Sequence, residues 1–280
     1  MSPDRRGAAV LGSPISHSLS PVLHQAAYDA LGLDGWAYRA IECIEADLGA
    51  TLRSLDDEGL AGVSLTMPLK RAVLDMLAST DNATRTAGVA NTVLFGATTG
   101  EWVGANTDVR GMTAVLRAVE SLASRDGTAW ILGAGATAAS ALTALAQFGF
   151  RRVAVAARRP DATAELAILA ERIGVRLTVH PWSEIAAATS APLVIATTPV
   201  GATDQLAATL PAVSGLLFDL VYARWPTVLA TAWKAAGGQV VGGLELLVEQ
   251  AAEQVRLMTG KTPPVDQMRR AGYAALNGRP

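Results

Sequence analysis

Three polar stretches in the first third of the chain carry residue types that could bind a ligand and transfer protons. They are Gly12–Pro21, Ser64–Lys70, and the pair Gly88–Thr92 and Gly104–Asp108. The hydroxyls of the first stretch stand at the expected start of a helix, whose free amides and positive dipole suit a carboxylate. Lys70 is one of only three lysines in the chain and follows a strand end. Each stretch alone fits turn and capping chemistry equally well, so their combination is what indicates a site.

A glycine loop in the middle of the chain predicts dinucleotide binding. The segment Trp130–Ala138 follows the form Gly-x-Gly-x-x-Ala, between an apolar strand and an alanine-rich helix. Gly133 permits a tight turn and Gly135 lets the backbone approach a pyrophosphate, which the helix N-terminus then binds. The alternative is a glycine loop that closes an ordinary strand-to-helix turn. The strand before the loop, the helix after it and the next strand at Arg152–Ala156 favour the dinucleotide.

The end of that next strand indicates which dinucleotide is bound. An NAD enzyme usually has Asp or Glu there, to accept hydrogen bonds from the ribose hydroxyls. This chain instead has Arg158 and Arg159 within Ala156–Pro160. Arginine pairs with a 2′-phosphate through charge-assisted hydrogen bonds, whereas an acid would repel it. The alternative is a solvated surface pair, but the missing acid favours NADP.

The first hundred residues, which contain these three polar stretches, are expected to form an α/β lobe. Strands are expected at Ala8–Leu11, Trp36–Ile41 and Gly62–Thr66, followed by a hairpin, Thr92–Phe95 and Glu101–Val103, around Gly96–Gly100. Ser20-Pro21 is expected to cap a helix that runs to about Leu31, because serine favours the cap and proline the first turn. Further helices are expected over Glu45–Leu55 and Leu69–Leu77.

The second half alternates strands and helices regularly after a polar break at Ser124–Gly127. The expected strands are Ala129–Leu132, Arg152–Ala156, Arg176–Val179, Leu193–Ala196, Leu216–Asp219 and Gln239–Val241. The expected helices are Thr137–Phe148, Asp161–Ile173, Trp182–Ala188 and Pro226–Ala236. Continuously apolar strands between helices predict a doubly wound parallel sheet, the Rossmann class. Two last helices, about Leu244–Met258 and Val265–Ala275, have no strand left to cover and should return to the first lobe.

We therefore predict three segments. Residues 1–107 form a substrate-binding and catalytic domain, 108–243 an NADP-binding domain, and 244–280 helices that pack back on the first domain. A chain of 280 residues with 50% hydrophobic and 17% charged residues can fill two such cores.

Composition excludes several other classes. The formal net charge of −2 gives no general attraction to nucleic acid or acidic membranes. The lone Cys43 excludes an internal disulfide framework and fits a reducing cytoplasm. The first residues lack the apolar run of a signal peptide, no apolar stretch is long enough to span a membrane, and no metal-ligand spacing is present. The histidines His24 and His180 are expected to be packing or surface residues.

Taken together and in order, the motifs resemble those of shikimate dehydrogenases. That family is marked by Gly-x-Pro-x-x-His-Ser-x-Ser-Pro, Val-Thr-x-Pro-x-Lys, Gly-Ala-x-Asn-Thr and Gly-x-Asn-Thr-Asp-x-x-Gly. The corresponding segments here are Gly12–Pro21, Leu65–Lys70, Gly88–Thr92 and Gly104–Gly111, with later similarities at Thr198–Gly201, Asp219–Tyr222 and Gly243–Ala251. The resemblance covers essentially the whole chain.

The resemblance implies roles for individual residues. Lys70 and Asp108 would be the catalytic pair, in which the ammonium polarises and protonates an oxygen and the carboxylate orients it. Ser18 and Ser20 would hold the substrate carboxylate, and Tyr222 would close over the bound ring. The ring hydroxyls would be contacted by Thr66, Asn91, Asp108 and Gln250.

The resemblance also implies the reaction and its cofactor. The reaction is the reversible reduction of 3-dehydroshikimate to shikimate, a step of chorismate and aromatic amino acid biosynthesis, with hydride from NADPH. The residues implied to bind NADP are Gly133, Ala134, Gly135, Ala136, Thr137, Ala157, Arg158, Arg159, Thr197, Thr198, Val221 and Gly243. No metal, nucleic acid or membrane partner is expected, and the protein would be a monomer or homodimer.

Some positions depart from the family pattern, and two alternatives stay open. The departures are Ser64, Ala136, Ala157, Ala196, Arg224, Glu245 and Leu246. A sister enzyme of the same fold that prefers quinate or an aminated analogue would use the same Lys70 and Asp108. A non-catalytic Rossmann ligand sensor is the other alternative, but it would be expected to lose one of that pair.

Overall fold

The computed structural model describes residues 6–96, 101–119 and 126–278. The chain folds into two compact units, unit 1 with residues 1–111 and 247–280, and unit 2 with residues 112–246. The chain leaves unit 1 inside helix α5 (Thr107–Ala118) and returns inside helix α10 (Gly243–Thr259). The predicted boundaries, 107/108 and 243/244, lie at the starts of these two helices.

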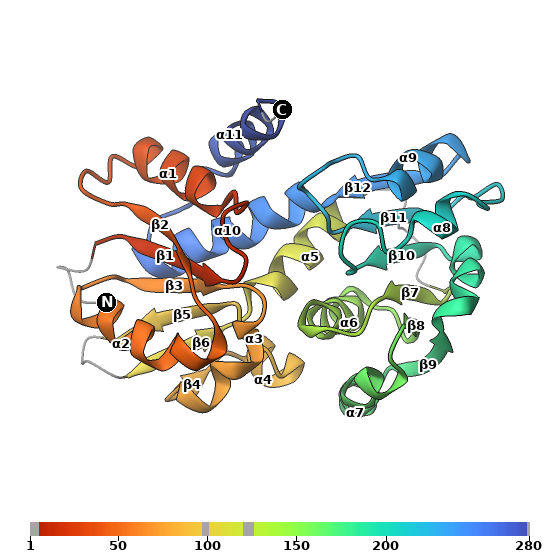
Figure 1. Cartoon of the computed structure of the whole chain (residues 1–280), viewed down its shortest axis with the longest axis horizontal. Helices are drawn as coiled ribbons and strands as arrows, with labels where there is room; N and C mark the ends of the chain where they lie inside the picture. Colours follow the sequence, from red (N-terminus) through yellow and green to blue (C-terminus); the bar gives the residue numbers. More distant parts are fainter. Residues whose placement is uncertain (1–5, 97–100, 120–125, 279–280) are drawn as a thin grey trace. The chain divides into compact units, whose positions relative to one another are not determined.

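Unit 1 is built on a mixed six-stranded sheet (Figure 1) in the order β2-β1-β3-β5-β6-β4. Its strands are β1 (Ala8–Gly12), β2 (Tyr38–Glu42), β3 (Gly62–Leu65), β4 (Ser79–Thr80), β5 (Thr92–Phe95) and β6 (Trp102–Ala105). Strands β1, β2 and β3 are parallel, and β5 is antiparallel to both β3 and β6. The predicted hairpin is present, but most of its turn, Gly96–Gly100, lies outside the described residues. The short β4 was not predicted.

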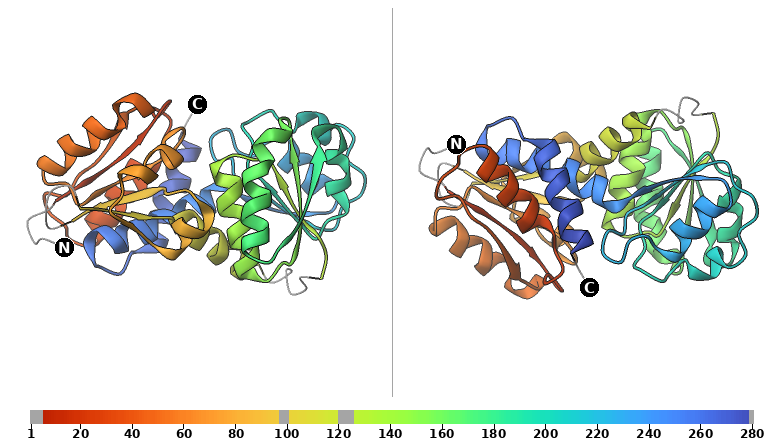
Figure 2. Two further views of the ribbon diagram at one scale, coloured as in Figure 1. Left: turned by 90° about the horizontal axis from the view of Figure 1, so that it is seen from below. Right: turned by 90° about the horizontal axis from the view of Figure 1, so that it is seen from above.

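The helices of unit 1 cover this sheet. They are α1 (Ser20–Ala30), η1 (Glu45–Asp47), α2 (Leu48–Asp57), α3 (Leu69–Ala72), η2 (Leu74–Met76), α4 (Asn82–Ala87) and α11 (Val265–Asn277), with parts of α5 and α10. Helix α11 packs against α1, as the views of Figures 1 and 2 show. The prediction that the C-terminal helices return to the first lobe is therefore confirmed.

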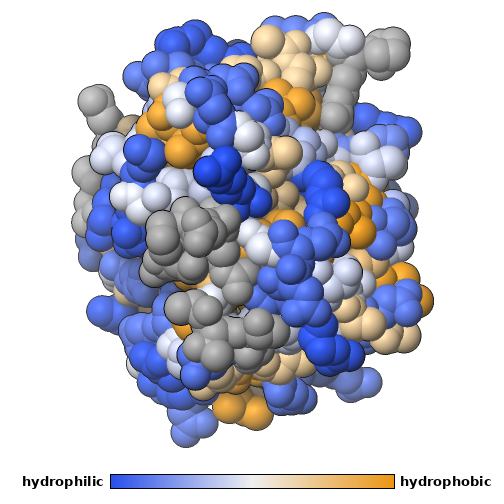
Figure 3. Space-filling view, turned by 90° about the vertical axis from the view of Figure 1, so that its left-hand side faces the viewer, coloured by the Kyte–Doolittle hydropathy of each residue, from blue (hydrophilic) through white to orange (hydrophobic). Residues whose placement is uncertain are grey.

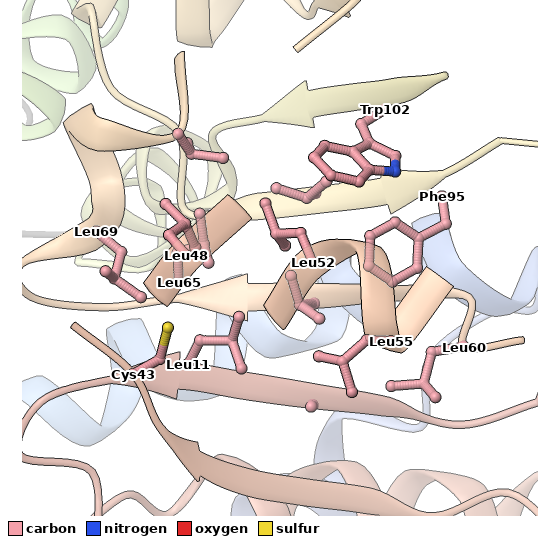
Figure 4. Packing of buried hydrophobic residues seen from close by; sticks show 14 of the residues in the cluster. Leu11, Cys43, Leu48, Leu52, Leu55, Leu60, Leu65, Leu69, Phe95 and Trp102 are labelled. Atoms are coloured by element: carbon pink, nitrogen blue, oxygen red, sulfur yellow. The ribbon is translucent and has the colours of Figure 1, made fainter. Parts of the chain in front are cut away.

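One core of unit 1 lies between α2 and the sheet. Leu48, Leu52 and Leu55 recur at helical spacing and point toward Leu11 and Leu65 of the strands (Figure 4). On the face of unit 1 in Figure 3 the hydrophobic residues occur in small, separate patches within a mostly hydrophilic surface. The three leucines of α2 are buried in the core of the unit.

The structure of unit 1 differs from the sequence predictions in three local features. Ser20 is the first residue of α1 and not its cap, because Leu19 holds that position and makes no side-chain cap bond. Proline is tolerated throughout a first helical turn, so Ser-Pro does not determine which residue is the cap. The helices expected over Glu45–Leu55 and Leu69–Leu77 each contain a 3-10 segment, η1 and η2. Helix α4 was missed, although Asp81 caps it by accepting a hydrogen bond from Thr84 N at 2.7 Å.

Unit 2 is a parallel six-stranded sheet in the order β12-β11-β10-β7-β8-β9. Its strands are β7 (Ala129–Leu132), β8 (Arg152–Ala157), β9 (Arg176–Pro181), β10 (Leu193–Ala196), β11 (Leu216–Asp219) and β12 (Gln239–Gly242). The doubly wound prediction is confirmed. The strand order reverses between β7 and β10, and ligands of such sheets bind beyond the carboxyl ends of the strands at that point.

Helices lie on both faces of this sheet, with α6 and α7 on one face and α9 on the other (Figure 2). They are α6 (Ala136–Phe148), η4 (Pro160–Thr163), α7 (Ala164–Arg172), η5 (Trp182–Ser190), α8 (Asp204–Ala207) and α9 (Val228–Ala235). The helix expected over Trp182–Ala188 is a 3-10 helix. The one expected from Pro226 starts at Val228, because Thr227 accepts a hydrogen bond from Ala230 N and caps it. The predicted break Ser124–Gly127 lies partly outside the described residues.

Within the described part of the chain, no helix is both long and apolar enough to cross a membrane.

Candidate active site

Lys70 and Asp108 form a close ion pair in unit 1. Lys70 lies in the first turn of α3, just after β3, and Asp108 in the first turn of α5, just after β6. Lys70 Nζ donates to Asp108 Oδ2 at 2.6 Å, and the two side chains are 13% and 8% exposed. The pair is thus mostly desolvated but still reachable, as proton exchange with a ligand requires.

Asn91 holds the other oxygen of Asp108. Its Nδ2 donates to Asp108 Oδ1 at 2.8 Å, and its Oδ1 accepts from the backbone N of Thr107 at 2.8 Å. Gln250, on α10, places its Oε1 3.3 Å from the same Nδ2. Residues that are far apart in the sequence are therefore joined around one carboxylate, which is fixed at both oxygens.

The serine loop adjoins the strand end that leads to Lys70. A Cβ at Gly12 would lie 2.2 Å from Cγ2 of Thr66, so only glycine allows this close approach. Ser13 N donates to Met67 O at 2.9 Å. Ser18 Oγ accepts from Ser20 N at 3.2 Å, which leaves the Ser18 hydroxyl proton available for another acceptor. Thr66 and Ser18 are half-buried, and Ser20 is buried.

In unit 2, the glycine loop links β7 to α6. Gly133 has a φ of +111°, and a Cβ there would lie 2.5 Å from Thr197 Oγ1, which itself donates to Leu132 O at 2.9 Å. Gly135 occupies the N-cap position of α6, where no side chain bonds to the free amides of the first turn. A Cβ at Gly135 would meet nothing within 4 Å. The start of α6 therefore combines an uncapped N-terminus with open space, the arrangement that binds phosphate.

The other predicted cofactor residues stand at neighbouring strand ends. Arg158 and Arg159 are exposed and follow β8, whereas Ala157 is its buried last residue and can offer only backbone atoms. Val221 O accepts from Gly243 N at 3.2 Å, so those two predicted residues adjoin. The structure places Thr198 beside Gly133, and Ala134, Ala136 and Thr137 in or next to the first turn of α6.

A buried carboxyl that accepts two hydrogen bonds shapes the loop that carries Val221 and Tyr222. Asp219 accepts from Val221 N at 3.2 Å and from Thr227 Oγ1 at 2.6 Å. Burial raises the pKa of Asp219 above its ordinary value, and these two hydrogen bonds offset only part of that rise. Tyr222 belongs to unit 2 and is half-buried.

Two negative findings limit the site. A groove of about 870 Å³ in unit 2, lined by Trp225, Lys234 and Val240 among others, includes none of the predicted site residues. In the described ranges no cluster of His, Cys, Asp or Glu could hold a metal ion.

Sequence reasoning missed a buried group near the Lys70–Asp108 pair. Gln254 lies one helical turn after Gln250 and contacts His24, Ser64, Thr92 and Thr107. His24 is fully buried, and burial lowers its pKa to about 3. The spacing of four residues between the two glutamines on one predicted helix was the available signal, because such residues share a helix face.

Comparison with known proteins agrees with this geometry. Residues 10–93 match the model of the shikimate dehydrogenase substrate binding domain, and residues 243–271 that of the shikimate 5′-dehydrogenase C-terminal domain. The chain is 34% identical to the shikimate dehydrogenase (NADP(+)) of Oleidesulfovibrio alaskensis, covering 93% of this chain and 92% of that protein.

Solved structures of similar proteins span nearly the whole chain. Mycobacterium tuberculosis shikimate dehydrogenase is 38% identical with a TM-score of 0.85, covering 96% of this chain and 99% of its own. The Thermus thermophilus enzyme, solved with NADP(H) and shikimate, is 34% identical with a TM-score of 0.83. The match covers 97% of this chain and 100% of that chain. Quinate dehydrogenase of Corynebacterium glutamicum, solved with NAD, is 27% identical with a TM-score of 0.83. The match covers 96% of this chain and 99% of that chain.

The matches over both ends of the chain, the identity to a relative over nearly its full length, and the paired Lys70 and Asp108 lead to one conclusion. This protein belongs to the shikimate dehydrogenase family.

Proposed function

We propose that this protein is an NADP-dependent oxidoreductase that reversibly reduces 3-dehydroshikimate to shikimate, a step of aromatic amino acid biosynthesis. The observation that carries the proposal is the Lys70–Asp108 pair, 2.6 Å apart, joined through Asn91 to Gln250. Unit 1 would bind the acid and unit 2 the dinucleotide.

The residues of unit 1 explain how the carbonyl is activated. The Lys70 ammonium is a compact cation that would stabilise the alkoxide forming at the reduced carbon and give it a proton. Asp108 keeps the ammonium in place through Oδ2 and is itself held by Asn91 at Oδ1. Because both carboxylate oxygens are bonded, the ammonium cannot move freely, and the pair is organised before substrate binds.

The serine loop would bind the carboxylate of the substrate. Ser18 has its hydroxyl proton to donate, because its oxygen already accepts from Ser20 N. Ser20 begins α1, whose N-terminus favours an anion. Thr66 and Gln250 would contact ring hydroxyls, and Tyr222 would complete the ring contacts.

The residues of unit 2 fit NADP. Gly135 leaves open space at the uncapped start of α6, where the remaining loop residues present their backbone to a pyrophosphate. Arg158 and Arg159 would pair with the 2′-phosphate. Bound NADPH would supply the hydride. Thr197, Thr198, Val221 and Gly243 stand at neighbouring strand ends of the same sheet.

A spectrophotometric screen tests the assignment. Shikimate, quinate and an aminated shikimate analogue are each offered with NADP and with NAD, and reduction of the cofactor is followed by its absorbance. Shikimate with NADP should give the highest kcat/KM. A higher value for quinate would make the protein a quinate dehydrogenase of the same fold, which is the second candidate because one similar structure is such an enzyme. No turnover with any pair would refute the proposal.

We further infer a cytoplasmic enzyme that is a monomer or homodimer. The support is the single cysteine, Cys43, which is buried and forms no disulfide, as fits a reducing compartment. Light scattering on a size-exclusion column would give the mass in solution, to be compared with the 28.9 kDa of one chain.

A further inference from the structure

Gln254 stands at the centre of a buried hydrogen-bond network behind the candidate active site. It is 1% exposed and lies on α10, four residues after Gln250. Its Oε1 accepts from Ser64 Oγ at 2.8 Å and lies 3.2 Å from His24 Nε2. Its Nε2 donates to Gln250 Oε1 at 2.8 Å, with Thr92 Oγ1 and Thr107 Oγ1 at 3.1 and 3.3 Å.

The orientation of this amide is determined by its neighbours. Tyr38 OH donates to Ser64 Oγ at 2.6 Å, so the Ser64 proton is directed to Gln254 Oε1. His24 Nε2 lies 3.2 Å from the same Oε1 and, as a ring nitrogen, adapts to it through its tautomer. A flipped Gln254 would place its oxygen against Gln250 Oε1 and its NH₂ against the Ser64 proton. Both contacts are repulsive, so only one orientation is satisfied.

That orientation sets the orientation of Gln250 in turn. Gln250 Oε1 accepts from Gln254 and lies near Asn91 Nδ2, while Gln250 Nε2 donates to Leu247 O at 3.0 Å. With its oxygen directed inward, Gln250 has a second Nε2 proton to offer a ring hydroxyl. Gln254 itself does not contact Lys70 or Asp108 in the described structure.

We propose that Gln254 is a positioning residue, which fixes the amide of Gln250 for ring binding through the chain Tyr38–Ser64–Gln254–Gln250. This inference rests on the proposed function, because it assumes that Gln250 contacts the shikimate ring. It predicts a change in substrate binding and little change in the chemical step, since the Lys70–Asp108 pair is held separately by Asn91.

The first test replaces the amide by a side chain of similar volume. Gln254→Met should raise the KM for shikimate about 5–30-fold, the scale of one or two lost hydrogen bonds, with kcat reduced less than about threefold and the KM for NADP unchanged. Glu253→Gln, at the preceding position of α10, is the control. It loses ion pairs to Arg256 and Arg110 and should lower stability without changing the KM for shikimate.

A double-mutant cycle with Gln250 decides whether Gln254 acts through it. In a Gln250→Ala background, Gln254→Met should raise the KM by less than about twofold further, because the residue that it positions is already gone. Multiplicative effects of the two changes would overturn the inference and give Gln254 a purely structural role.

Gln254→Glu provides a second variant in case Gln254→Met does not fold. A protonated glutamic acid can accept from Ser64 and donate to Gln250 as the amide does, whereas the carboxylate cannot donate. The ratio of its KM to that of the wild type should therefore fall as the pH is lowered from about 8 to 6, while the ratio for Glu253→Gln stays constant. A ratio for Gln254→Glu that does not depend on pH would contradict the inference.

The outcomes separate the two proposals. If the wild-type protein does not oxidise shikimate, the proposed function and this inference both fail. If the wild type is active but the KM is unchanged in both Gln254 variants, only this inference fails.

Discussion

The two candidate binding sites are built from different parts of the polypeptide. In unit 1, the site consists of buried side chains that hydrogen-bond to one another, from Lys70 through Asp108 and Asn91 to Gln250 and Gln254. In unit 2, it consists mainly of backbone, with an uncapped helix start at Gly135 and exposed arginines nearby.

This difference follows from what each ligand presents. A small hydroxylated acid has to be distinguished by the positions of single polar atoms, which requires donors and acceptors of fixed orientation. A pyrophosphate is recognised by charge and by amides, which any helix N-terminus supplies if side chains leave room. Even conservative substitutions of the polar side chains should therefore have large effects on kinetics in unit 1. In unit 2 the largest effects on cofactor binding should come from adding a Cβ to a glycine or removing the charge of an arginine.

The largest effect is expected at the side-chain site. Lys70→Ala should lower kcat about 10²–10⁴-fold, because it removes the proposed general acid, while the KM for shikimate changes far less. The exposed Lys261 supplies the control, since Lys261→Ala should leave both constants unchanged. Steady-state kinetics check this. Near-normal turnover of the Lys70 variant would remove the contrast between the two sites.

A smaller effect is expected from the loss of charge in unit 2. Arg158→Ser should lower kcat/KM with NADP about ten- to a hundredfold, because it removes the proposed charge-assisted partner of the 2′-phosphate, and hardly alter kcat/KM with NAD. Salt should weaken NADP more than NAD, since Arg158 is exposed. Arg176→Ser, at the opposite end of the neighbouring β9, is the control. Equal losses with both cofactors would mean that Arg158 does not read the phosphate.

A pair of glycine variants tests whether the cofactor site is made of backbone. Gly135→Ala should leave the unliganded protein as stable as the wild type, because a Cβ there meets nothing within 4 Å, yet weaken NADP binding about tenfold. Gly133→Ala should instead destabilise the protein by about 1–3 kcal/mol, because its φ is +111° and its Cβ would meet Thr197 Oγ1. Denaturant unfolding and cofactor titration separate the two. Similar loss of stability in both variants would argue against open space at Gly135.

The smallest effect concerns pH and the buried network of unit 1. The pKa of His24 is lowered by burial to about 3, below its unfolded value of about 6.5, so the unfolded chain binds more protons between these values. The stability that His24 contributes is complete above pH 6.5 and is lost as the pH falls toward 3. Lowering the pH from 7 to 6 should cost roughly 0.7 kcal/mol through this group.

Comparison with His24→Gln isolates that contribution. The variant should lose less stability between pH 7 and 6 than the wild type. Urea unfolding at the two pH values measures the difference. If the stability of His24→Gln depended on pH as that of the wild type does, the pKa of His24 would be the same in the folded and unfolded states.

The sequence by itself was enough for the architecture of unit 2. Its strands were predicted to within about two residues. The four inner strands, β7, β8, β10 and β11, are buried and are continuous apolar runs that end at turn residues. Gly133, Gly135, Lys70 and Asp108 could also be identified as candidates, since each stands in a local motif.

The tertiary structure decided what lies behind those motifs. Ser64 and His24 meet Gln254 across 190 and 230 residues of sequence, and no local pattern encodes such a contact. The start of α1 and the 3-10 segments could not be predicted either. An α-helical turn and a 3-10 turn, or two neighbouring helix starts, differ little in free energy, so the tertiary structure decides between them. A buried polar side chain must find its partners wherever the fold brings them, so the network around Gln254 became visible only in the folded chain.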